Sequence, residues 1–262
     1  MPGTLYIVST PIGNLEDMTF RAVRILKEVG VIAAEDTRHT KQLCTHFGIH
    51  TPLTSYHDFN KEEKTVVLLE RLQAGTDVAL VSDAGTPVVS DPGFFLITRA
   101  IEAGIRVVPV PGPSAVLAAL AGSGLPTDSF RFEGFLPRKE GPRTRRISRF
   151  CEDPASVILF ESPHRIDKLL ASLLAGLGNR RAVLARELTK HYEEFHRGTL
   201  EELIALVRSR PPKGEITLVV EGAAKRRRSE PGEDAGQEHE REEDEDDPGP
   251  EKQSGGGRKA TA

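Results

Sequence analysis

Apolar residues in the first 224 positions form short runs, separated by longer segments in which apolar residues recur at helical spacing. The runs, rich in β-branched residues, predict strands at residues 5–8, 31–33, 78–81, 106–110, 157–160, 182–185 and 216–220. Helical spacing predicts helices at residues 19–29, 62–74, 94–103, 114–121, 165–174 and 200–207. Continuous apolar strands that alternate with helices are typical of an α/β fold in which helices cover both faces of a sheet.

Two changes in composition divide the chain. Residues 121–129, AGSGLPTDS, are the best candidate linker, and they predict one α/β domain at 1–122 and a second at 123–224. Residues 225–262 contain no Leu, Ile, Val, Phe, Met, Tyr or Trp. With no apolar surface to bury, this segment cannot offset the entropy of ordering, so we expect a disordered charged tail.

The formal net charge of −4 at first disfavours a nucleic-acid partner, because phosphate binding requires positive charge. The tail alone has 8 basic and 12 acidic residues, however, and the first 224 residues are neutral, with 27 of each. Within that neutral part, residues 136–150 have a local charge of +5. A solvated surface is the usual interpretation of such a run, but arginine matches phosphate oxygens well, which favours a polyanion-binding segment. Its basic residues are Arg138, Lys139, Arg143, Arg145, Arg146 and Arg149.

Several protein classes are disfavoured. No apolar run approaches the roughly 18 residues of a membrane span, and the first residues lack the features of a signal peptide. Cys44 and Cys151 cannot form a disulfide framework, and no Cys/His spacing suggests a metal site, so we expect a cytoplasmic protein without metal. GxGxxG after the first strand, GxxxxGK[ST], GxSxG and HExxH are all missing, which disfavours ordinary dehydrogenases, P-loop NTPases, esterases and zinc proteases.

Four predicted strands are followed by segments rich in Gly, Pro and small polar residues. These are residues 9–15, 35–40, 82–87 and 111–115. Any one of them could simply turn the chain. Ligands in open α/β sheets bind beyond the carboxyl ends of the strands, however. Four such loops at one sheet edge, two of them with carboxylates, predict a site for a small polar ligand with a charged group.

Two segments of the second half also follow predicted strands. The first is FESPHR, residues 160–165, in which the structural interpretation is that Ser162 caps a helix and Pro163 takes its first position. His164 and Arg165 would then lie in the first turn, near where an anion could dock. In RELTK, residues 186–190, Glu187 and Lys190 could form only a weak surface ion pair. His191 and His196 lack ligand-like companions, so we expect solvated or partly packed histidines.

At these same residues the sequence resembles the tetrapyrrole-methylase (class III methyltransferase) superfamily, in its ribosomal RNA branch. The blocks STPIGNLEDMTFRA, AAEDTRHT, VSDAGTPVVSDPG and VPVPGPSA occur in that order. FEGFLPR, LFESPHR, ARELTKHYEEFHRGT and KGEITLVVEG follow. The resemblance covers about residues 3–223 and leaves the tail outside it.

The resemblance implies two α/β domains, with S-adenosylmethionine in the cleft between them, and a homodimer. Because this class does not use the Rossmann fingerprint, the missing GxGxxG is expected. The resemblance places these residues in the cofactor pocket: Pro11, Ser82, Asp83, Ala84, Gly85, Thr86, Pro111, Ser114, Ala115, Phe160, Glu187, Leu188 and Thr189.

The activity it implies is 2′-O-methylation of a cytidine ribose in the 16S RNA of the bacterial small ribosomal subunit. A ribose hydroxyl is a poor acid, so a general base or a group that favours the alkoxide should help. We hypothesise that Asp36, Arg38 and Glu161 lie near the substrate. Two alternatives remain open, a small-molecule (tetrapyrrole-type) methyltransferase of the same superfamily and a non-catalytic RNA-binding relative. The arginine-rich segment weighs against the first.

Overall fold

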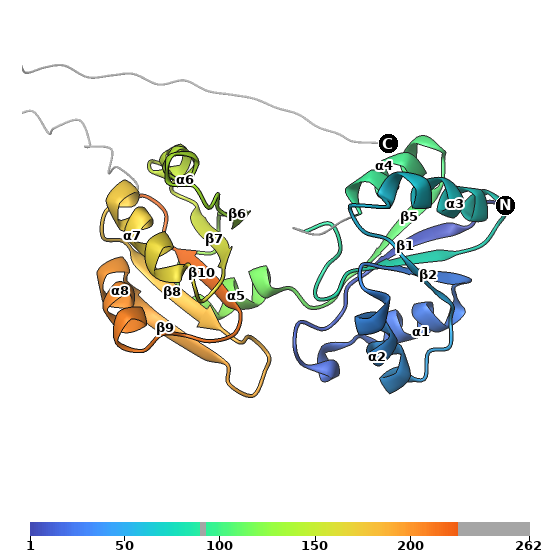
Figure 1. Cartoon of the computed structure of the whole chain (residues 1–262), viewed down its shortest axis with the longest axis horizontal. Coiled ribbons are helices and arrows are strands. Elements are labelled where there is room, and N and C mark those ends of the chain that lie inside the picture. The colour runs from blue at the N-terminus through green and yellow to red at the C-terminus, as the bar shows by residue number, and fades with distance from the viewer. Residues whose placement is uncertain (90–92, 225–262) are drawn as a thin grey trace, which may run out of the picture. The chain divides into compact units, whose positions relative to one another are not determined.

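The computed structural model describes residues 1–89 and 93–224, in which the strands form two five-stranded sheets (Figure 1). The predicted tail, residues 225–262, lies outside the described residues.

The first sheet is entirely parallel, with strand order β3-β2-β4-β1-β5. Its strands are β1 (Thr4–Val8), β2 (Val31–Ala34), β3 (Leu53–Ser55), β4 (Val78–Val81) and β5 (Arg106–Val110). Helices α1 (Phe20–Glu28) and α2 (Thr37–Phe47) cover one face, and α3 (Lys61–Gln73) and α4 (Phe94–Glu102) cover the other (Figure 1). A short 3-10 turn, Leu15–Asp17, precedes α1.

The strand sequences explain this three-layer arrangement. All four residues of β2 and all four of β4 are buried, as expected for central strands covered on both sides. Alternate residues of a strand point to opposite faces, so Ile32 packs toward α1 and α2, whereas Val31 packs toward α3 and α4. Because every strand is parallel, all five carboxyl ends meet at one edge of the sheet.

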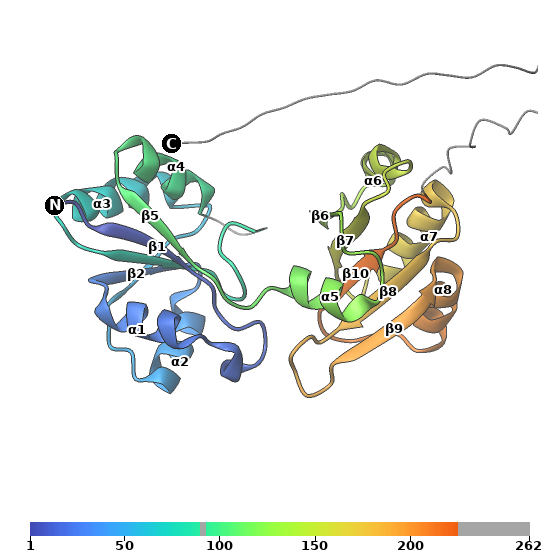
Figure 2. The same cartoon turned by 180° about the vertical axis from the view of Figure 1, so that it is seen from behind.

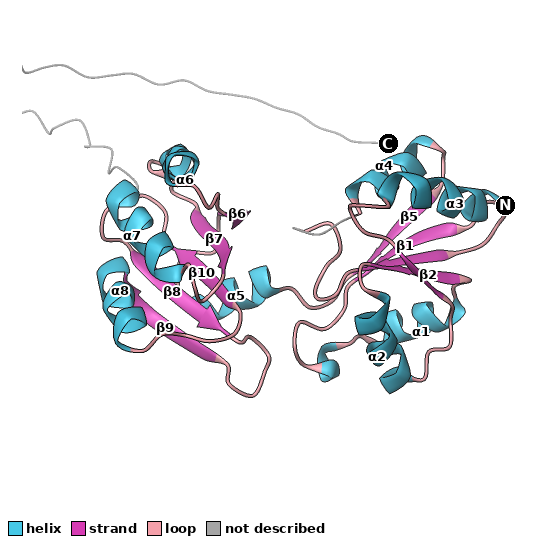
Figure 3. Cartoon of the chain, in the orientation of Figure 1, coloured by secondary structure: helices cyan, strands magenta, loops and turns pink. Residues whose placement is uncertain are grey.

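The second sheet is mixed, with order β6-β7-β10-β8-β9, in which only the β6–β7 pair is parallel. Its strands are β6 (Phe130–Phe135), β7 (Ser156–Glu161), β8 (Arg181–Arg186), β9 (Glu194–Thr199) and β10 (Ile216–Val220). Helices α6 (Glu140–Ile147), α7 (Ile166–Leu177) and α8 (Leu200–Ser209) pack on one face, with a 3-10 turn at Ser148–Phe150 (Figure 3).

The opposite face of the second sheet packs against α5 (Ala115–Ser123) (Figure 2). Val116, Ala119 and Leu120 of this helix form one cluster with Ile158, Val183 and Val219 of the sheet. The domain boundary after residue 122 remains a prediction. The packing of α5 favours a boundary before this helix, since its partners lie in the second sheet.

All seven predicted strands and all six predicted helices are present within a few residues of their expected bounds. Three strands, β3, β6 and β9, and two helices, α2 and α6, were not predicted. The expectation that Ser162 caps a helix is wrong. Residues 162–165 form a turn, closed where Arg165 N–H and Ile166 N–H donate to the Ser162 carbonyl, and α7 begins only at Ile166.

Candidate active site

The loops at the carboxyl edge of the first sheet are bound to one another. The backbone N–H of Thr10, after β1, donates to the Gly85 carbonyl at 2.9 Å, and Gly85 N–H donates back at 3.0 Å. The hydroxyls of Ser9 and Thr86 lie 3.0 Å apart. Thr86 also lies 3.5 Å from the carbonyl of Pro113, after β5. The loops of β1, β4 and β5 therefore form one hydrogen-bonded surface.

A cavity of about 350 Å³ opens beside this surface and takes its remaining wall from the second sheet. Within the described part of the chain, its lining is mainly apolar and contains no Lys, Arg or His. The lining residues are Ile12, Ala84, Gly85, Thr86, Val89, Ser114, Ala115, Val116, Phe135, Phe160, Glu161, Ser162, Pro163, Leu188, Gly214, Glu215, Ile216 and Thr217. An apolar cavity of this size with a few polar groups is the usual form of a small-ligand site.

Glu161 brings a buried carboxylate to the cavity wall at the end of β7. The residue is 3% exposed, its Oε1 accepts from Ser162 N–H at 2.8 Å, and its Oε2 lies 3.0 Å from a guanidinium nitrogen of Arg165. Burial raises the pKa of this carboxyl, and the Ser162 N–H and the Arg165 guanidinium oppose that rise. Glu161 is thus a cavity-lining carboxyl whose pKa is raised above its ordinary value.

The loop after β8 turns a side chain into the same cavity through unusual backbone geometry. Glu187 and Thr189 have φ values of 51° and 65°, which are rare for residues other than glycine, and Leu188 between them lines the cavity. Backbone strain of this kind persists only where the surroundings impose it, and it clusters at functional sites.

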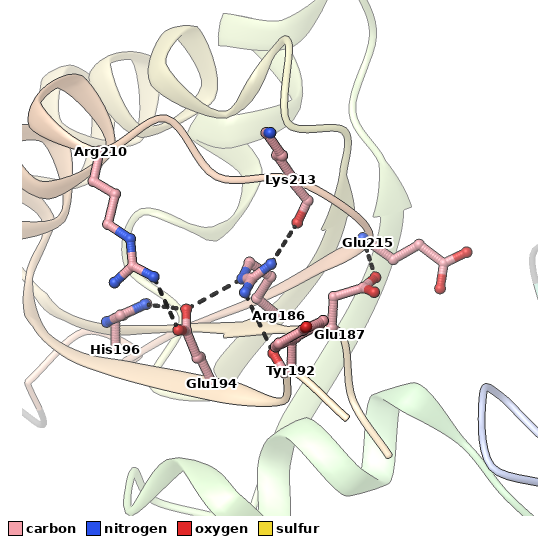
Figure 4. A network of polar contacts seen from close by, with 8 residues as sticks. All are labelled: Arg186, Glu187, Tyr192, Glu194, His196, Arg210, Lys213 and Glu215. Carbon is pink, nitrogen blue, oxygen red and sulfur yellow. Dashed lines mark hydrogen bonds and ion pairs between the residues drawn. The ribbon is translucent and has the colours of Figure 1, made fainter. Parts of the chain in front are cut away.

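The contacts that impose this geometry reach across to the segment before β10 (Figure 4). Glu187 Oε1 accepts from Glu215 N–H at 2.9 Å, and Lys190 Nζ lies 3.0 Å from Glu187 and 2.8 Å from Glu215. The Glu215 N–H, followed by the Lys190 ammonium, holds the pKa of Glu187 below its ordinary value. The ion pair is therefore structural, and half-buried rather than a weak surface contact.

On the other side of this loop, Arg186 donates to Glu194, to the Lys213 carbonyl and to the Tyr192 carbonyl (Figure 4). Glu194 also pairs with Arg210 and with His196, which is therefore a partly packed histidine with a carboxylate partner. These contacts line a separate cavity of about 250 Å³. The polar side chains that line this second cavity are therefore bonded to one another, and the bonds from Arg186 to the Tyr192 and Lys213 carbonyls hold the loop in place.

Asp36 and Arg38 form a compact pair at the start of α2. Asp36 caps the helix, with Oδ1 accepting from Arg38 N–H at 2.8 Å and Oδ2 lying 2.7 Å from the Arg38 guanidinium. The Arg38 side chain, and after it the Arg38 N–H, hold the pKa of Asp36 far below its ordinary value. Asp36 is therefore a poor proton acceptor. The Arg38 side chain points into solvent and is 89% exposed.

The predicted cofactor residues divide among three locations. Ala84, Gly85, Thr86, Ser114, Ala115, Phe160 and Leu188 line the large cavity. Pro11, Ser82 and Asp83 line a smaller one of about 220 Å³ on the other side of the β1 loop, together with His39. Asp83 accepts from Asp36 N–H at 3.0 Å, which joins the β2 and β4 loops. Pro111, Glu187 and Thr189 line neither cavity, although Glu187 and Thr189 flank Leu188.

The basic segment directly follows a cavity residue in the chain. Phe135, the last residue of β6, lines the cavity, and Leu136 is the first residue of the segment. Two of its arginines are bound to the protein. Arg143 donates to Ser172 and to the Arg138 carbonyl, and Arg146 pairs with Glu133. The other four have exposed side chains and form no ion pair with any residue of the described ranges, namely Arg138, Lys139, Arg145 and Arg149.

Several lining residues were not predicted. Ile12, Val116, Ile216 and Thr217 carry no chemical signal in the sequence, because they are apolar or small residues of ordinary strands, loops and helices. Phe135 could have been found, since an exposed aromatic residue next to a basic segment is typical of RNA-binding surfaces.

Comparison with known families agrees with this architecture. Residues 4–204 match the family model described as Tetrapyrrole (Corrin/Porphyrin) Methylases. The chain belongs to this family.

Within the family, the chain is similar to proteins named ribosomal RNA small subunit methyltransferase I. It is 54% identical over 220 residues to the one from Halalkalibacterium halodurans, covering 84% of this chain and 76% of the relative. It is 53% identical over 222 residues to the one from Synechocystis sp., covering 84% and 80%.

Among solved structures, the fold is similar to that of uroporphyrin-III C-methyl transferase from Thermus thermophilus complexed with S-adenyl homocysteine. The TM-score is 0.58 at 22% identity, and the match covers 83% of this chain and 97% of that one. In the described ranges, no helix has the length and hydropathy of a membrane span. The same ranges contain no group of three or more His, Cys, Asp or Glu side chains placed to hold a metal ion.

The cavity wall depends on a glycine in a left-handed conformation, and this dependence can be tested. Gly214 has φ +85°, and a Cβ there would lie 2.2 Å from Glu187 Oε1. We expect Gly214→Ala to lower the free energy of unfolding by about 3 kcal/mol, from backbone strain and displacement of Glu187. Gly48, with φ +60° and no atom within 4 Å of a Cβ, is the matched control, and Gly48→Ala should cost only about 1 kcal/mol. Urea unfolding of both variants measures the difference; equal losses would contradict a clash at Glu187.

Proposed function

We propose that this protein transfers a methyl group from S-adenosylmethionine to the 2′-oxygen of a cytidine ribose in the 16S RNA of the bacterial small ribosomal subunit. The observation that carries the proposal is the 54% identity, over 84% of the chain, to a ribosomal RNA small subunit methyltransferase I. The geometry supports it, because a mainly apolar cavity lies next to an exposed basic segment.

The large cavity fits S-adenosylmethionine in chemistry as well as in size. The cofactor has an aromatic adenine, which suits a wall of Phe160, Leu188 and Ile216. It also has a net positive charge, and among the described lining residues the charged side chains are those of Glu161 and Glu215. When bound, the cofactor supplies an electrophilic methyl group on a sulfonium. We propose that Ala84, Gly85, Thr86, Ser114, Ala115, Phe160 and Leu188 hold it, and that Pro11, Ser82 and Asp83 support the loops around it.

Glu161 is the group that we propose as the proton acceptor for the ribose hydroxyl. It is buried at the cavity wall, and its raised pKa keeps it more basic than an ordinary carboxylate. Asp36 cannot serve as well, because the Arg38 guanidinium occupies its carboxylate. We propose instead that Asp36 orients Arg38, whose exposed guanidinium binds an RNA phosphate. The cavity supplies the other requirement, a fixed position for the reacting groups.

The exposed face of the basic segment is proposed to bind the ribosomal RNA backbone. Arg138, Lys139, Arg145 and Arg149 are the residues available for phosphate contacts, whereas Arg143 and Arg146 hold the segment in shape. A homodimer and a cytoplasmic location are further parts of the proposal. The resemblance to the family supports the dimer, and a substrate in the ribosome supports the location.

The decisive experiment is methyl transfer to small ribosomal subunits isolated from cells that lack the modification. With radiolabelled S-adenosylmethionine, we expect one methyl group per subunit on a cytidine 2′-oxygen. Glu161→Gln should lower kcat by about 10²-fold or more at saturating cofactor, as expected for loss of a general base. Turnover on a tetrapyrrole and none on subunits would instead support a small-molecule methyltransferase, and RNA binding without cofactor binding would support a non-catalytic protein.

Cofactor binding in the large cavity can be tested by filling it. Ala115 is at the start of α5 and lines the cavity, so Ala115→Leu should reduce S-adenosylmethionine affinity at least about tenfold, because the added atoms occupy ligand volume. Leu117, two residues further along the helix, is 56% exposed and lines neither cavity, so Leu117→Ala is the control and should bind normally. Isothermal titration calorimetry gives both affinities. Normal binding by Ala115→Leu would place the cofactor elsewhere.

The RNA contact predicts a change in salt dependence. Replacing Arg145 and Arg149 together by glutamine should weaken RNA binding and reduce the slope of log affinity against log salt by up to about 2, since each phosphate contact releases counterions. The control replaces Lys27 and Arg71, two exposed basic residues at the C-terminal ends of α1 and α3, and should leave the slope unchanged. Cofactor affinity should be normal in both pairs. An unchanged slope in the first pair would exclude this segment from the RNA interface.

A further inference from the structure

Arg165 lies between the two parts of the proposed site and contacts both. One guanidinium nitrogen, Nη2, lies 3.0 Å from Glu161 Oε2, and the same nitrogen donates to the Leu136 carbonyl at 2.9 Å. Glu161 lines the cavity, and Leu136 is the first residue of the basic segment. The Arg165 side chain is mostly buried, at 26% exposure.

From this geometry we infer that Arg165 is a positioning residue: it keeps the Glu161 carboxylate ionised and oriented toward the cavity, and with the same side chain it fixes the start of the basic segment. This inference rests on the proposed function, since it gives Glu161 its catalytic role there. It also replaces the interpretation in which Arg165 lies where an anion could dock, because its side chain is mostly buried and its Nη2 contacts two protein oxygens.

The electrostatic setting shows why Glu161 needs such a partner. A carboxylate that is 1% exposed loses most of its hydration, and without a countercharge it takes up a proton. The basic groups that act on Glu161 are Arg165 from the turn before α7, Arg143 from α6 and Arg138 from the loop before α6. Of these, only Arg165 contacts the carboxylate, while Arg143 binds Ser172 and the Arg138 carbonyl. Across the cavity, Glu215 is paired with Lys190.

The turn that holds Arg165 is itself fixed. Arg165 N–H and Ile166 N–H both donate to the Ser162 carbonyl, at 3.0 and 3.1 Å, and Ser162 N–H donates to Glu161. The carboxylate, the turn and the guanidinium therefore form one closed hydrogen-bonded unit. Lysine keeps the positive charge, but its ammonium on a shorter, flexible stem does not reproduce the fixed position of Nη2 between the two oxygens.

The experiment compares wild-type protein, Arg165→Gln and Arg165→Lys over a range of pH. If Glu161 must be ionised, the acidic limb of kcat should move to higher pH in the order wild type, Arg165→Lys, Arg165→Gln. At a pH below both midpoints, Arg165→Gln should have about tenfold lower kcat than wild type and should regain it in alkaline buffer, because an opposite charge in contact shifts a carboxyl by about one pH unit or more. Cofactor affinity should stay normal, since Arg165 does not line the cavity. Arg208→Gln, which breaks the exposed Arg208–Asp167 pair, is the matched control, and it should leave the acidic limb of the kcat profile at its wild-type pH.

A second measurement does not depend on enzymatic activity. Difference infrared titration, with each protein compared with its own Glu161→Gln derivative, follows the ionisation of this carboxylate alone. The inference predicts that it titrates at higher pH in Arg165→Gln than in wild type. An unmoved titration in a folded variant would overturn the inference, and if Arg165→Gln does not fold, an unmoved titration in Arg165→Lys does the same. Wild-type protein that fails to methylate ribosomal subunits would overturn the proposed function instead, because the titration still reports on Arg165.

Discussion

The arrangement of the site depends on the parallel pairing of the first sheet. Only when β1, β4 and β5 run in the same direction do their carboxyl ends reach one edge, and only there can Thr10 and Gly85 exchange backbone hydrogen bonds. That exchange joins the β1 and β4 loops, as the Ser9–Thr86 contact also does, and the bond from Thr86 to the Pro113 carbonyl joins them to the β5 loop. A parallel sheet must be covered on both faces, which explains why its central strands are wholly apolar and why the functional polar residues lie just beyond them.

The second sheet serves the site by different means, because only some of its strand ends face the cavity. Glu161, at the end of β7, brings a charge, and the loop after β8 brings an apolar side chain, Leu188, at the expense of backbone strain. Ion pairs on both sides of that loop make this strained geometry stable, with Lys190 on one side and Arg186 on the other. The polar network of Figure 4 therefore has a structural purpose, which is to hold Leu188 and Glu187 in place.

Much of this fold follows from the sequence, and the elements that were missed share a physical cause. Central strands such as β4 and β10 are buried on both faces, so their sequences are continuous apolar runs. The missed strand β9, EFHRGT, is an edge strand without a fully buried residue, and β3 has only three half-buried residues. Helix α6 contains a glycine and a proline, and only Ile147 is buried. Tertiary contacts rather than local pattern create these elements.

The site was predictable to a similar degree. Its position followed from loop composition at strand ends, and the carboxylates at those ends were visible as candidates. The distinction between them was not visible, because it depends on neighbours: Arg38 neutralises Asp36 from two residues away, while burial leaves Glu161 basic. The turn at residues 162–165 determines which groups Arg165 contacts. A helix beginning at Ser162 would have directed Arg165 toward a ligand, whereas the turn directs it to Glu161 and Leu136.

Charge separation unites these features. The proposed reaction brings a cationic cofactor and a polyanionic substrate to adjacent places, so a uniformly charged surface would repel one of them. The protein solves this by burying the Glu161 carboxylate at the cavity and displaying unpaired cations on the segment that leaves it. Arg165 lies at the junction, where its single positive charge compensates the cavity carboxylate and its donor group holds the basic segment. The first 224 residues are neutral in sum, so net charge alone conceals this arrangement.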